Sequence, residues 1–476
     1  MSRRPMTTKR YLLLTAMMTA AVSVAGCSTI SKINPFDKKE ANKTLATQGQ
    51  RISVIAFDQK VEPSEALKGS DFFLPEPTVQ ADWPLPGGNA EQSVEHVAAA
   101  ANFDVAWRKG FGQKANRKYH VTAPPVAADG KIFVMDGEAT VVAIDARSGS
   151  TVWKKDLRPA KAPGKKHGFL GLGGSAGDRT GFGGGVAYAN GKLYVSSGFR
   201  FVAQLDAATG AEAWRQQTST PIHAAPTVAD GRVFVISTDN ELLTFNAADG
   251  APGWTYQALI EPARILAASS PAVSGDTVVA GFASGELVAL RATNGNDLWS
   301  EALSRASRTN ALSEIRDIAG RPVIFKGDVF AVSHSGVFAA TDLRTGQARW
   351  SLPVTAITSP WAAGDVVYVV DKSGQVICVS REAGQVYWIR DLNNTEQLSK
   401  KQKKKRAKHP LLWSSPILAS GRLITVSSEG QAVALNPKTG ETLKTLKLGQ
   451  RTLLGPIAMG DTVYVATDEA DLIAIR

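Results

Sequence analysis

The chain has 476 residues, and its 54 Lys and Arg against 43 Asp and Glu give a formal net charge of +11. Four cations lie in the first ten residues and seven lie in the run Lys400–Lys408, so the remainder of the chain is formally neutral. The basic excess therefore does not indicate a nucleic-acid-binding surface, and we expect no nucleic-acid partner. Only two cysteines are present, which excludes a disulfide-rich scaffold and predicts no disulfide.

The first 26 residues have the pattern of a signal peptide. Basic residues between positions 3 and 10 precede the short apolar stretch Tyr11–Val24, and small residues lead to Cys27. This ending resembles the lipobox of bacterial lipoproteins, which implies that Cys27 is lipidated and becomes the first residue of the mature protein. Ser28 favours sorting to the outer membrane, facing the periplasm, over retention at the inner membrane. The alternative is an ordinary signal peptide whose cleavage site lies beside a cysteine.

Residues 27–101 are polar and irregular in pattern. Ile52–Phe57 reads as a single strand, and the prolines and glycines of residues 84–88 mark a loop. We expect a lipid-anchored tether that is flexible at first and whose later part packs against the domain beginning at residue 102.

A short phrase recurs seven times between Asp145 and Lys444. In its first copy, Val142–Trp153, the polar Asp145 can start a turn, and Gly149 supplies the positive φ that a hairpin loop needs. A small residue lies two positions before the turn in every copy except at Gln204, and we expect it to let neighbouring sheets approach closely. The Gly position holds Gly149, Gly210, Gly250, Gly295, Gly346, Gly384 and Gly440, and the Trp position holds Trp153, Trp214, Trp254, Trp299, Trp350, Trp388 and, in the seventh copy, Lys444.

A second hairpin precedes each phrase. Most copies open with a Pro, which is tolerated at the first residue of a strand, and a Gly then turns the chain into an apolar run rich in β-branched residues. The Pro positions are Pro125, Pro226, Pro271, Pro322, Pro360, Pro416 and Pro456. One unit therefore has four short strands, which is typical of a propeller blade.

The two ends of the repeat region complete each other. The last copy stops at Leu472–Arg476, and Val105–Arg108 supplies the missing fourth strand, with Trp107 in the eighth Trp position. We therefore predict an all-β fold for residues 102–476: an eight-bladed β-propeller of four-stranded blades. Pairing the N-terminal strand with the C-terminal blade closes the ring and removes the exposed sheet edges of an open array.

Two copies carry insertions. The Gly-rich segment 164–185 lacks the Gly-Lys-Ser/Thr ending of a phosphate-binding loop, so we expect a mobile surface loop, with partner contact as the alternative. The Lys-rich segment 393–409 is too charged to fold alone, and we expect a solvated, disordered loop. Attraction to anionic lipid headgroups or to an acidic protein face is the alternative for this segment.

No catalytic constellation stands out. The six histidines are dispersed, with neither the spacing of a zinc site nor a Cys-His cluster, and no Gly-x-Ser-x-Gly elbow is present. Cys378 has the pattern of a small buried residue. A propeller can assemble a site from distant blades, so these absences do not exclude catalysis, but they leave no catalytic residue, no metal and no cofactor to predict.

The repeats resemble the blades of quinoprotein dehydrogenases, which bind pyrroloquinoline quinone in an eight-bladed propeller. Ala203–Trp214 and Ala340–Trp350 come close to their repeat. The chain is shorter than those enzymes, lacks their adjacent Cys pair and shows no calcium-binding stretch. With the lipobox and the tether, the eight blades resemble the BamB family, lipoproteins of the outer-membrane β-barrel assembly (BAM) complex.

The resemblance to the BamB family implies a partner-binding rim on two neighbouring connectors. Glu314–Val323 is similar to the family's Asp-bearing connector, although the family's second Asp falls on Ala319. In the family this connector and the preceding one contact a POTRA domain of BamA. The residues implied are Arg264, Ile265, Leu266, Arg316 and Asp317. The alternative is structural: Ile265 and Leu266 cap the blades and Asp317 caps a turn.

The resemblance implies a non-enzymatic scaffold that binds the BamA POTRA domains and other BAM subunits. Such a scaffold receives unfolded outer-membrane proteins as clients, aids their assembly and insertion, and is held at the membrane by its lipid anchor. Two alternatives stay open. One is a periplasmic dehydrogenase dependent on pyrroloquinoline quinone, and the other is an envelope propeller that binds polysaccharide.

Overall fold

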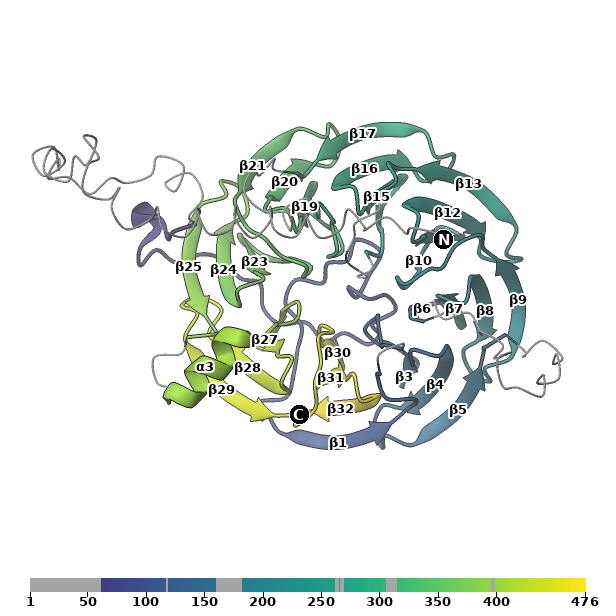
Figure 1. Cartoon of the computed structure of the whole chain (residues 1–476), viewed down its shortest axis with the longest axis horizontal. Helices are drawn as coiled ribbons and strands as arrows, with labels where there is room; N and C mark the ends of the chain where they lie inside the picture. The colour runs from purple at the N-terminus through teal and green to yellow at the C-terminus, as the bar shows by residue number, and fades with distance from the viewer. Residues whose placement is uncertain are drawn as a thin grey trace, which may run out of the picture. The chain divides into compact units, whose positions relative to one another are not determined.

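A computed structural model describes residues 61–116, 119–159, 182–261, 265, 269–304, 315–394 and 399–476. Contacts divide the chain into Met1–Gln59 and Lys60–Arg476, and the described strands all belong to the second unit. These strands form eight four-stranded antiparallel sheets, arranged around a ring in Figure 1. The predicted all-β, eight-bladed propeller is confirmed. The predicted strand at Ile52–Phe57 and the lipidation site Cys27 lie outside the described residues.

The blades are numbered in chain order, and the strands of each run from the innermost to the outermost. Blade 1 comprises β2 (Val126–Ala128), β3 (Lys131–Met135), β4 (Thr140–Asp145) and β5 (Thr151–Asp156). Blade 2 comprises β6 (Gly184–Ala189), β7 (Lys192–Ser197), β8 (Phe201–Asp206) and β9 (Glu212–Gln217). Blade 3 comprises β10 (Thr227–Ala229), β11 (Arg232–Ile236), β12 (Glu241–Asn246) and β13 (Pro252–Gln257). Blade 4 comprises β14 (Ala272–Ser274), β15 (Thr277–Gly281), β16 (Glu286–Arg291) and β17 (Asp297–Ala302).

Blade 5 comprises β18 (Val323–Phe325), β19 (Asp328–Val332), β20 (Phe338–Asp342) and β21 (Ala348–Leu352). Blade 6 comprises β22 (Trp361–Ala363), β23 (Val366–Val370), β24 (Gln375–Ser380) and β25 (Val386–Asp391). Blade 7 comprises β26 (Ile417–Ala419), β27 (Arg422–Val426), β28 (Gln431–Leu435) and β29 (Thr442–Lys447). Blade 8 comprises β30 (Ile457–Met459), β31 (Thr462–Ala466), β32 (Asp471–Ile475) and β1 (Val105–Gly110). The described helices are the short η2 (Glu65–Leu67) and α3 (Lys400–Lys408).

Burial changes from the inside of each blade to the outside. In blade 1 the middle strands β3 and β4 are buried along almost their whole length, because a neighbouring blade covers each face of the sheet. The outermost strand β5 instead alternates between exposed and half-buried residues. The middle strands therefore have continuous apolar runs, whereas the outer strand shows the period of two expected when one face meets solvent.

The Trp and Gly of the repeat pack against each other across blade junctions. The indole of Trp153 covers Gly210 of the next blade, where an added Cβ would lie 2.8 Å from the ring, and its Nε1–H donates to the Ala207 carbonyl at 3.0 Å. Gly210 also has a φ of +72°. The same contact joins Trp214 to Gly250, Trp254 to Gly295, Trp299 to Gly346, Trp350 to Gly384 and Trp388 to Gly440. The Gly is therefore required twice, by the turn and by the indole.

The small residue of the repeat lies opposite the Trp in the strand ladder. Ala143 pairs with Trp153, and Cys378 pairs with Trp388. The exception, Gln204, pairs with Trp214 and donates its side-chain amide to the Ala247 carbonyl at 2.6 Å. That carbonyl also accepts the Trp214 Nε1–H, so the polar side chain adds a hydrogen bond across the junction.

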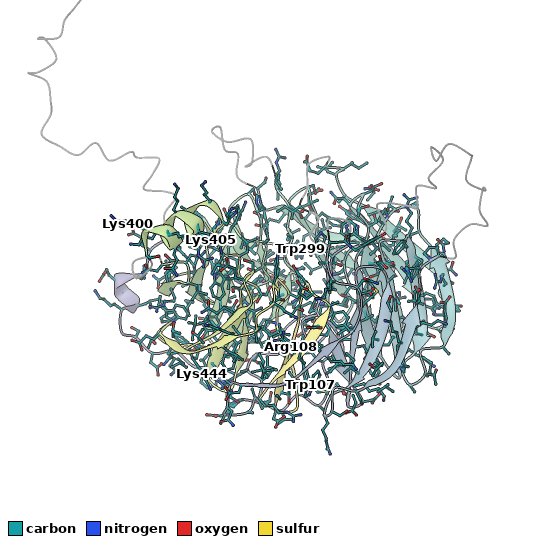
Figure 2. All side chains as sticks on the ribbon, turned by 60° about the horizontal axis from the view of Figure 1, so that its bottom comes forward. Trp107, Arg108, Trp299, Lys400, Lys405 and Lys444 are labelled. Atoms are coloured by element: carbon teal, nitrogen blue, oxygen red, sulfur yellow. The ribbon has the colours of Figure 1, made fainter. Side chains whose placement is uncertain are left out.

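The predicted closure of the ring is present. β1 pairs with β32 in antiparallel register, with Trp107 opposite Ala474, and backbone hydrogen bonds in both directions between Asp104 and Arg476 continue the ladder. Trp107 covers Gly149 of blade 1. Figure 2 shows Trp107 of β1 and Lys444 of β29 on the same side of the ring.

Residues 78–98 cross the middle of the ring, where Figure 1 shows the purple segment. Their backbone bonds to the free edges of innermost strands in several blades, including Trp83 to Ala127 and Val97 to Leu418. Trp83 is buried and stacks on Trp361, with ring centroids 6.3 Å apart. The segment thus pairs polar groups that the inner strands would otherwise leave open, and it fills one end of the central channel.

The expectation of a disordered Lys-rich loop is wrong for residues 400–408, which form the helix α3. The Ser399 hydroxyl accepts from Gln402 N–H while the Gln402 side chain accepts from Ser399 N–H, which is a capping box. Lys405 and Arg406 pair with Glu429 of blade 7, each at 3.3 Å. The expectation of disorder was based on the charge of the segment alone, so it took account of neither the capping box nor the carboxylate of Glu429. The helix buries no residue, and no helix among the described residues is long and apolar enough to cross a membrane.

Candidate functional site

The two faces of the ring differ in which loops they carry. Each blade has an even number of antiparallel strands, so every connector from an outermost strand to the next innermost strand begins and ends on one face, which we call the connector face. The tight turns between the first two and the last two strands of a blade lie on the other face, which we call the turn face. Residues 78–98 fill the channel near the turn face, where Gly460 N–H donates to the Gln80 carbonyl.

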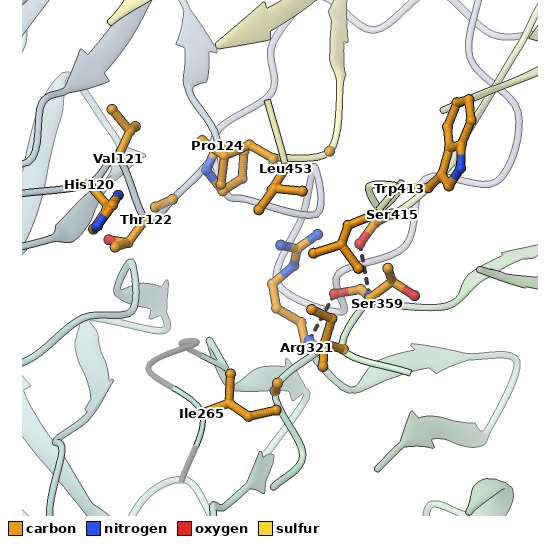
Figure 3. Close-up of a pocket in the computed structure, with 18 of the residues that line it drawn as sticks. His120, Val121, Thr122, Pro124, Ile265, Arg321, Ser359, Trp413, Ser415 and Leu453 are labelled. Carbon is orange, nitrogen blue, oxygen red and sulfur yellow. Dashed lines mark hydrogen bonds between the residues drawn. The ribbon is translucent and has the colours of Figure 1, made fainter. Parts of the chain in front are cut away.

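A cavity of about 420 Å³ lies at the centre of the connector face, as Figure 3 shows. All eight connectors contribute to its wall. One lining residue from each, in ring order, is Thr122, Phe182, Ala225, Ser270, Arg321, Thr358, Trp413 and Leu453. This volume falls in the range of small-molecule sites, and a site built from every blade is the arrangement that a closed ring makes possible.

The predicted contact residues lie on two connectors that the structure brings together. The Ile265 N–H donates to the Asp317 carboxylate at 3.1 Å. Arg316 is exposed, whereas Asp317 is only 4% exposed. Arg264 and Leu266 lie outside the described residues. Asp317 therefore holds the two connectors in position, and Arg316 is the charged side chain that a partner can reach.

His334 forms hydrogen bonds with the connector that contains Asp317. Its backbone N–H donates to the Asp317 carbonyl at 2.8 Å, and its Nδ1 lies 3.3 Å from the Ile315 carbonyl. The Lys372 ammonium lies 2.8 Å from its Nε2. Burial, and then the charge of Lys372, lower the pKa of His334 below its usual value, so the imidazole is neutral at neutral pH. A neutral ring donates through Nδ1 and accepts from Lys372, which fits both contacts.

Arg321 is a residue of the cavity that the sequence reasoning missed. Its backbone N–H donates to the Ser359 hydroxyl at 2.8 Å, and the Ser359 N–H donates to the Ser415 hydroxyl at 2.8 Å. Its guanidinium extends into the cavity in Figure 3. The buried Nε has no hydrogen-bond partner among the described residues. Burial lowers the pKa of this guanidinium from its usual value to about 10.

The repeat itself contains the signal that identifies Arg321. In the seven copies that have a Pro, the residue before it is small or apolar in all but one. Those six are Pro124, Ala225, Ser270, Ser359, Ser415 and Gly455. Arg321 is the exception, so aligning the copies one position before the Pro would have found it.

Metal-ligating and nucleophilic groups do not gather in the described part of the chain. No group of three or more His, Cys, Asp or Glu residues there is placed to hold a metal ion. Cys378 is buried opposite Trp388, and burial raises the pKa of its thiol well above the usual value. A buried, protonated thiol is a packing residue.

Fold and site together define the class of this protein: an eight-bladed β-propeller with quinoprotein-like repeats and a cavity at the centre of its connectors. A model of the family described as outer membrane protein assembly factor BamB matches residues 90–167 and 172–390. The chain belongs to this family.

Individual relatives have the same description. Over 367 residues the chain is 25% identical to outer membrane protein assembly factor BamB of Moranella endobia, covering 75% of this chain and 86% of that protein. Over 382 residues it is 26% identical to the Escherichia coli K12 protein, covering 80% of this chain and 88% of that protein.

Solved structures share the fold at lower identity. The crystal structure of BamB from Moraxella catarrhalis matches with a TM-score of 0.60 at 17% identity, covering 79% of this chain and 99% of that one. A quinohemoprotein alcohol dehydrogenase from Comamonas testosteroni matches with a TM-score of 0.62 at 16% identity, covering 83% of this chain and 80% of that one. At these identities the likeness shows the propeller alone.

Proposed function

We propose that this chain is a non-enzymatic scaffold of the outer-membrane β-barrel assembly complex. Membership of the family of assembly factors supports this role. The observation that carries the proposal is the junction of the two connectors, where the Asp317 carboxylate accepts from Ile265 N–H and leaves Arg316 exposed beside it. A rim fixed in this way suits a binding surface, because little ordering entropy is lost on association.

The partner proposed for this rim is a POTRA domain of BamA. Arg316 is suited to a carboxylate of the partner, since a guanidinium binds a carboxylate through two parallel hydrogen bonds. Ile265 is half-buried on the neighbouring connector and offers an apolar contact. Other subunits of the complex and unfolded outer-membrane proteins are further proposed partners. Outermost strands such as β5, whose residues alternate between exposed and half-buried, present an edge that a client strand can join.

Lipidation at Cys27 is proposed to hold the propeller at the outer membrane on its periplasmic side. The Cys27→Ala variant should then be released as a soluble periplasmic protein, measured by fractionation after cell breakage. If this variant stayed with the membranes, the proposal of a lipid anchor at Cys27 would be contradicted.

The binding proposal is tested by extracting membranes with mild detergent and recovering BamA with the tagged chain. Arg316→Glu should abolish recovery, because it places a negative charge where a carboxylate is proposed to bind. Arg344→Glu is the matched control, since Arg344 is an exposed residue of the same blade on the turn face. Absence of BamA from the wild-type eluate would overturn the proposed function. Equal recovery with both variants would overturn the assignment of the rim.

Asp317 gives a second, graded test of the same rim. Asp317→Ala leaves Ile265 N–H without its acceptor, so we expect weaker BamA recovery, whereas Asp317→Asn keeps an acceptor oxygen and should retain more. Circular dichroism separates loss of binding from loss of folding. Full recovery with folded Asp317→Ala would show that the bridge is not needed.

The dehydrogenase alternative has the shared ring in its favour. The residues that the structure describes offer no carboxylate cluster for a calcium ion, which does not favour a quinone enzyme of that kind. Dye-linked alcohol or sugar oxidation by the purified protein, after addition of pyrroloquinoline quinone and calcium, would reverse this conclusion. A glycan-binding screen addresses the polysaccharide alternative in the same way.

A further inference from the structure

The central cavity contains a cationic group that the fold does not use. Among the described residues Arg321 forms no ion pair, and its Nε has no hydrogen-bond partner. Arg321 is half-buried, with its Nε fully buried. An unpaired guanidinium in that setting is costly, so a ring that needed this position only for packing would do better with the small or apolar residue that the other copies have. The Arg321 guanidinium is instead suited to binding an anionic ligand.

The carboxylates near Arg321 are already engaged elsewhere. Asp468 pairs with Arg451 Nε at 3.1 Å, and Asp371 accepts hydrogen bonds from the Ser373 hydroxyl and Gln375 N–H. The described lining contains three permanently cationic side chains and these two acids, which leaves a net positive charge. An anionic ligand would supply the counter-charge that the described lining lacks.

Two hydroxyl groups add donors beside the guanidinium. Ser359 and Ser415 each accept a backbone N–H through Oγ, and neither hydroxyl proton is donated to another described residue. Figure 3 shows both serines on one side of the Arg321 guanidinium, with Pro124 and Leu453 on the other. A guanidinium with two nearby hydroxyls is the donor set that carboxylate and phosphate oxygens require.

We propose that the connector-face cavity binds a small molecule through a carboxylate or phosphate held by Arg321, Ser359 and Ser415. The apolar side chains Val121, Pro124 and Leu453 then receive the remainder of the ligand, which we infer to be apolar. A volume of about 420 Å³ accommodates a ligand of this kind, with one charged end and a body of aromatic-ring size. This inference is independent of the proposed role in assembly.

The experiment uses the purified full-length mature protein and three probes of similar shape: 3-phenylpropionate, phenyl phosphate and the neutral 3-phenylpropanamide. Binding is measured by ligand-observed NMR and by the rise in the unfolding temperature. We expect one or both anions to bind and the amide to bind at least about tenfold more weakly, which is the size of a charge-assisted hydrogen bond. The preferred anion distinguishes a carboxylate ligand from a phosphate ligand.

Two variants locate the binding site. Arg321→Gln should weaken anion binding by about tenfold or more while leaving the ligand-free protein at least as thermostable as wild type, because an unpaired, half-buried charge is removed. Arg344→Gln removes an exposed guanidinium of the same blade and should bind as wild type does. Unchanged anion binding by folded Arg321→Gln would overturn the proposal.

A chemical measurement keeps the inference testable if Arg321→Gln does not fold. Phenylglyoxal modifies accessible arginines, and peptide mass spectrometry reads the extent at Arg321 and Arg344 in the same sample. The preferred anion should protect Arg321 and leave Arg344 unprotected. Equal binding of the amide and the anions, or no protection of Arg321, would contradict an oxyanion site.

Discussion

The junctions between blades 1 to 7 and the two junctions of blade 8 solve the same packing problem with different contacts. At each of the first six, a Trp indole covers a turn Gly and donates to a carbonyl of the next blade at 2.7–3.2 Å. Between blades 7 and 8, Lys444 takes the Trp position and pairs with Asp104 at 3.4 Å. Between blades 8 and 1, Trp107 covers Gly149, but its Nε1 has no hydrogen-bond partner among the described residues.

The topology of blade 8 explains why no Trp–Gly contact joins blades 7 and 8. Its last two strands, β32 and β1, are not consecutive in the chain, so no turn joins them and no turn Gly is present for an indole to cover. At the other junction the Tyr464 hydroxyl donates to the Ala146 carbonyl at 3.1 Å, which is the acceptor position that the repeat assigns to Trp107. The closing blade therefore depends on the β1–β32 ladder, whereas the other junctions depend on the indoles.

The largest effect is expected when a Cβ is forced into a Trp–Gly contact. Gly210→Ala puts a methyl group 2.8 Å from the Trp153 indole at a φ of +72°, and we expect a loss of about 2–4 kcal/mol in the free energy of unfolding. Gly231→Ala is the matched control, because Gly231 has the same φ of +72° and open space around it. It should cost about 1 kcal/mol by denaturant titration. Equal losses would show that the indole contact contributes nothing.

A smaller effect separates the two kinds of Trp. Trp153→Phe loses the Nε1–H bond to the Ala207 carbonyl, whereas Trp107→Phe loses no hydrogen bond to the described residues. Trp153→Phe should therefore destabilise the protein by about 1 kcal/mol more than Trp107→Phe, measured by thermal unfolding of both variants. The reverse order would mean that closure of the ring depends on Trp107 more than on its strand ladder.

The smallest effect is expected at Lys444. The Lys444 side chain is 47% exposed and that of Asp104 is 67% exposed, and an exposed ion pair contributes less than about 1 kcal/mol. Lys444→Ala should lower the stability by no more than this at low salt and by nothing measurable at high salt, as seen in unfolding curves at two ionic strengths. A large loss that persists in salt would show a packing role at the seam.

The sequence predicts those features that depend on residues close together in the chain, and it does not predict those that depend on distant segments. A turn Gly and the Trp four residues later indicate a hairpin and a packing contact that recur from blade to blade. The number of blades and the closure of the ring through Trp107 could therefore be predicted. Burial of Asp317 was not, because it depends on a connector 52 residues away along the chain. The helix α3 needed Glu429 of another segment, and Arg321 became visible only when the copies were compared with one another.

The central claim, that the connector face is the binding face, is tested most directly by site-specific photo-crosslinking in cells. A photoreactive amino acid placed at position 316 reports on the connector face, and one at position 344 reports on the turn face of the same blade. The account predicts a crosslink to BamA from position 316 and none from position 344. Crosslinking from position 344 alone would contradict it.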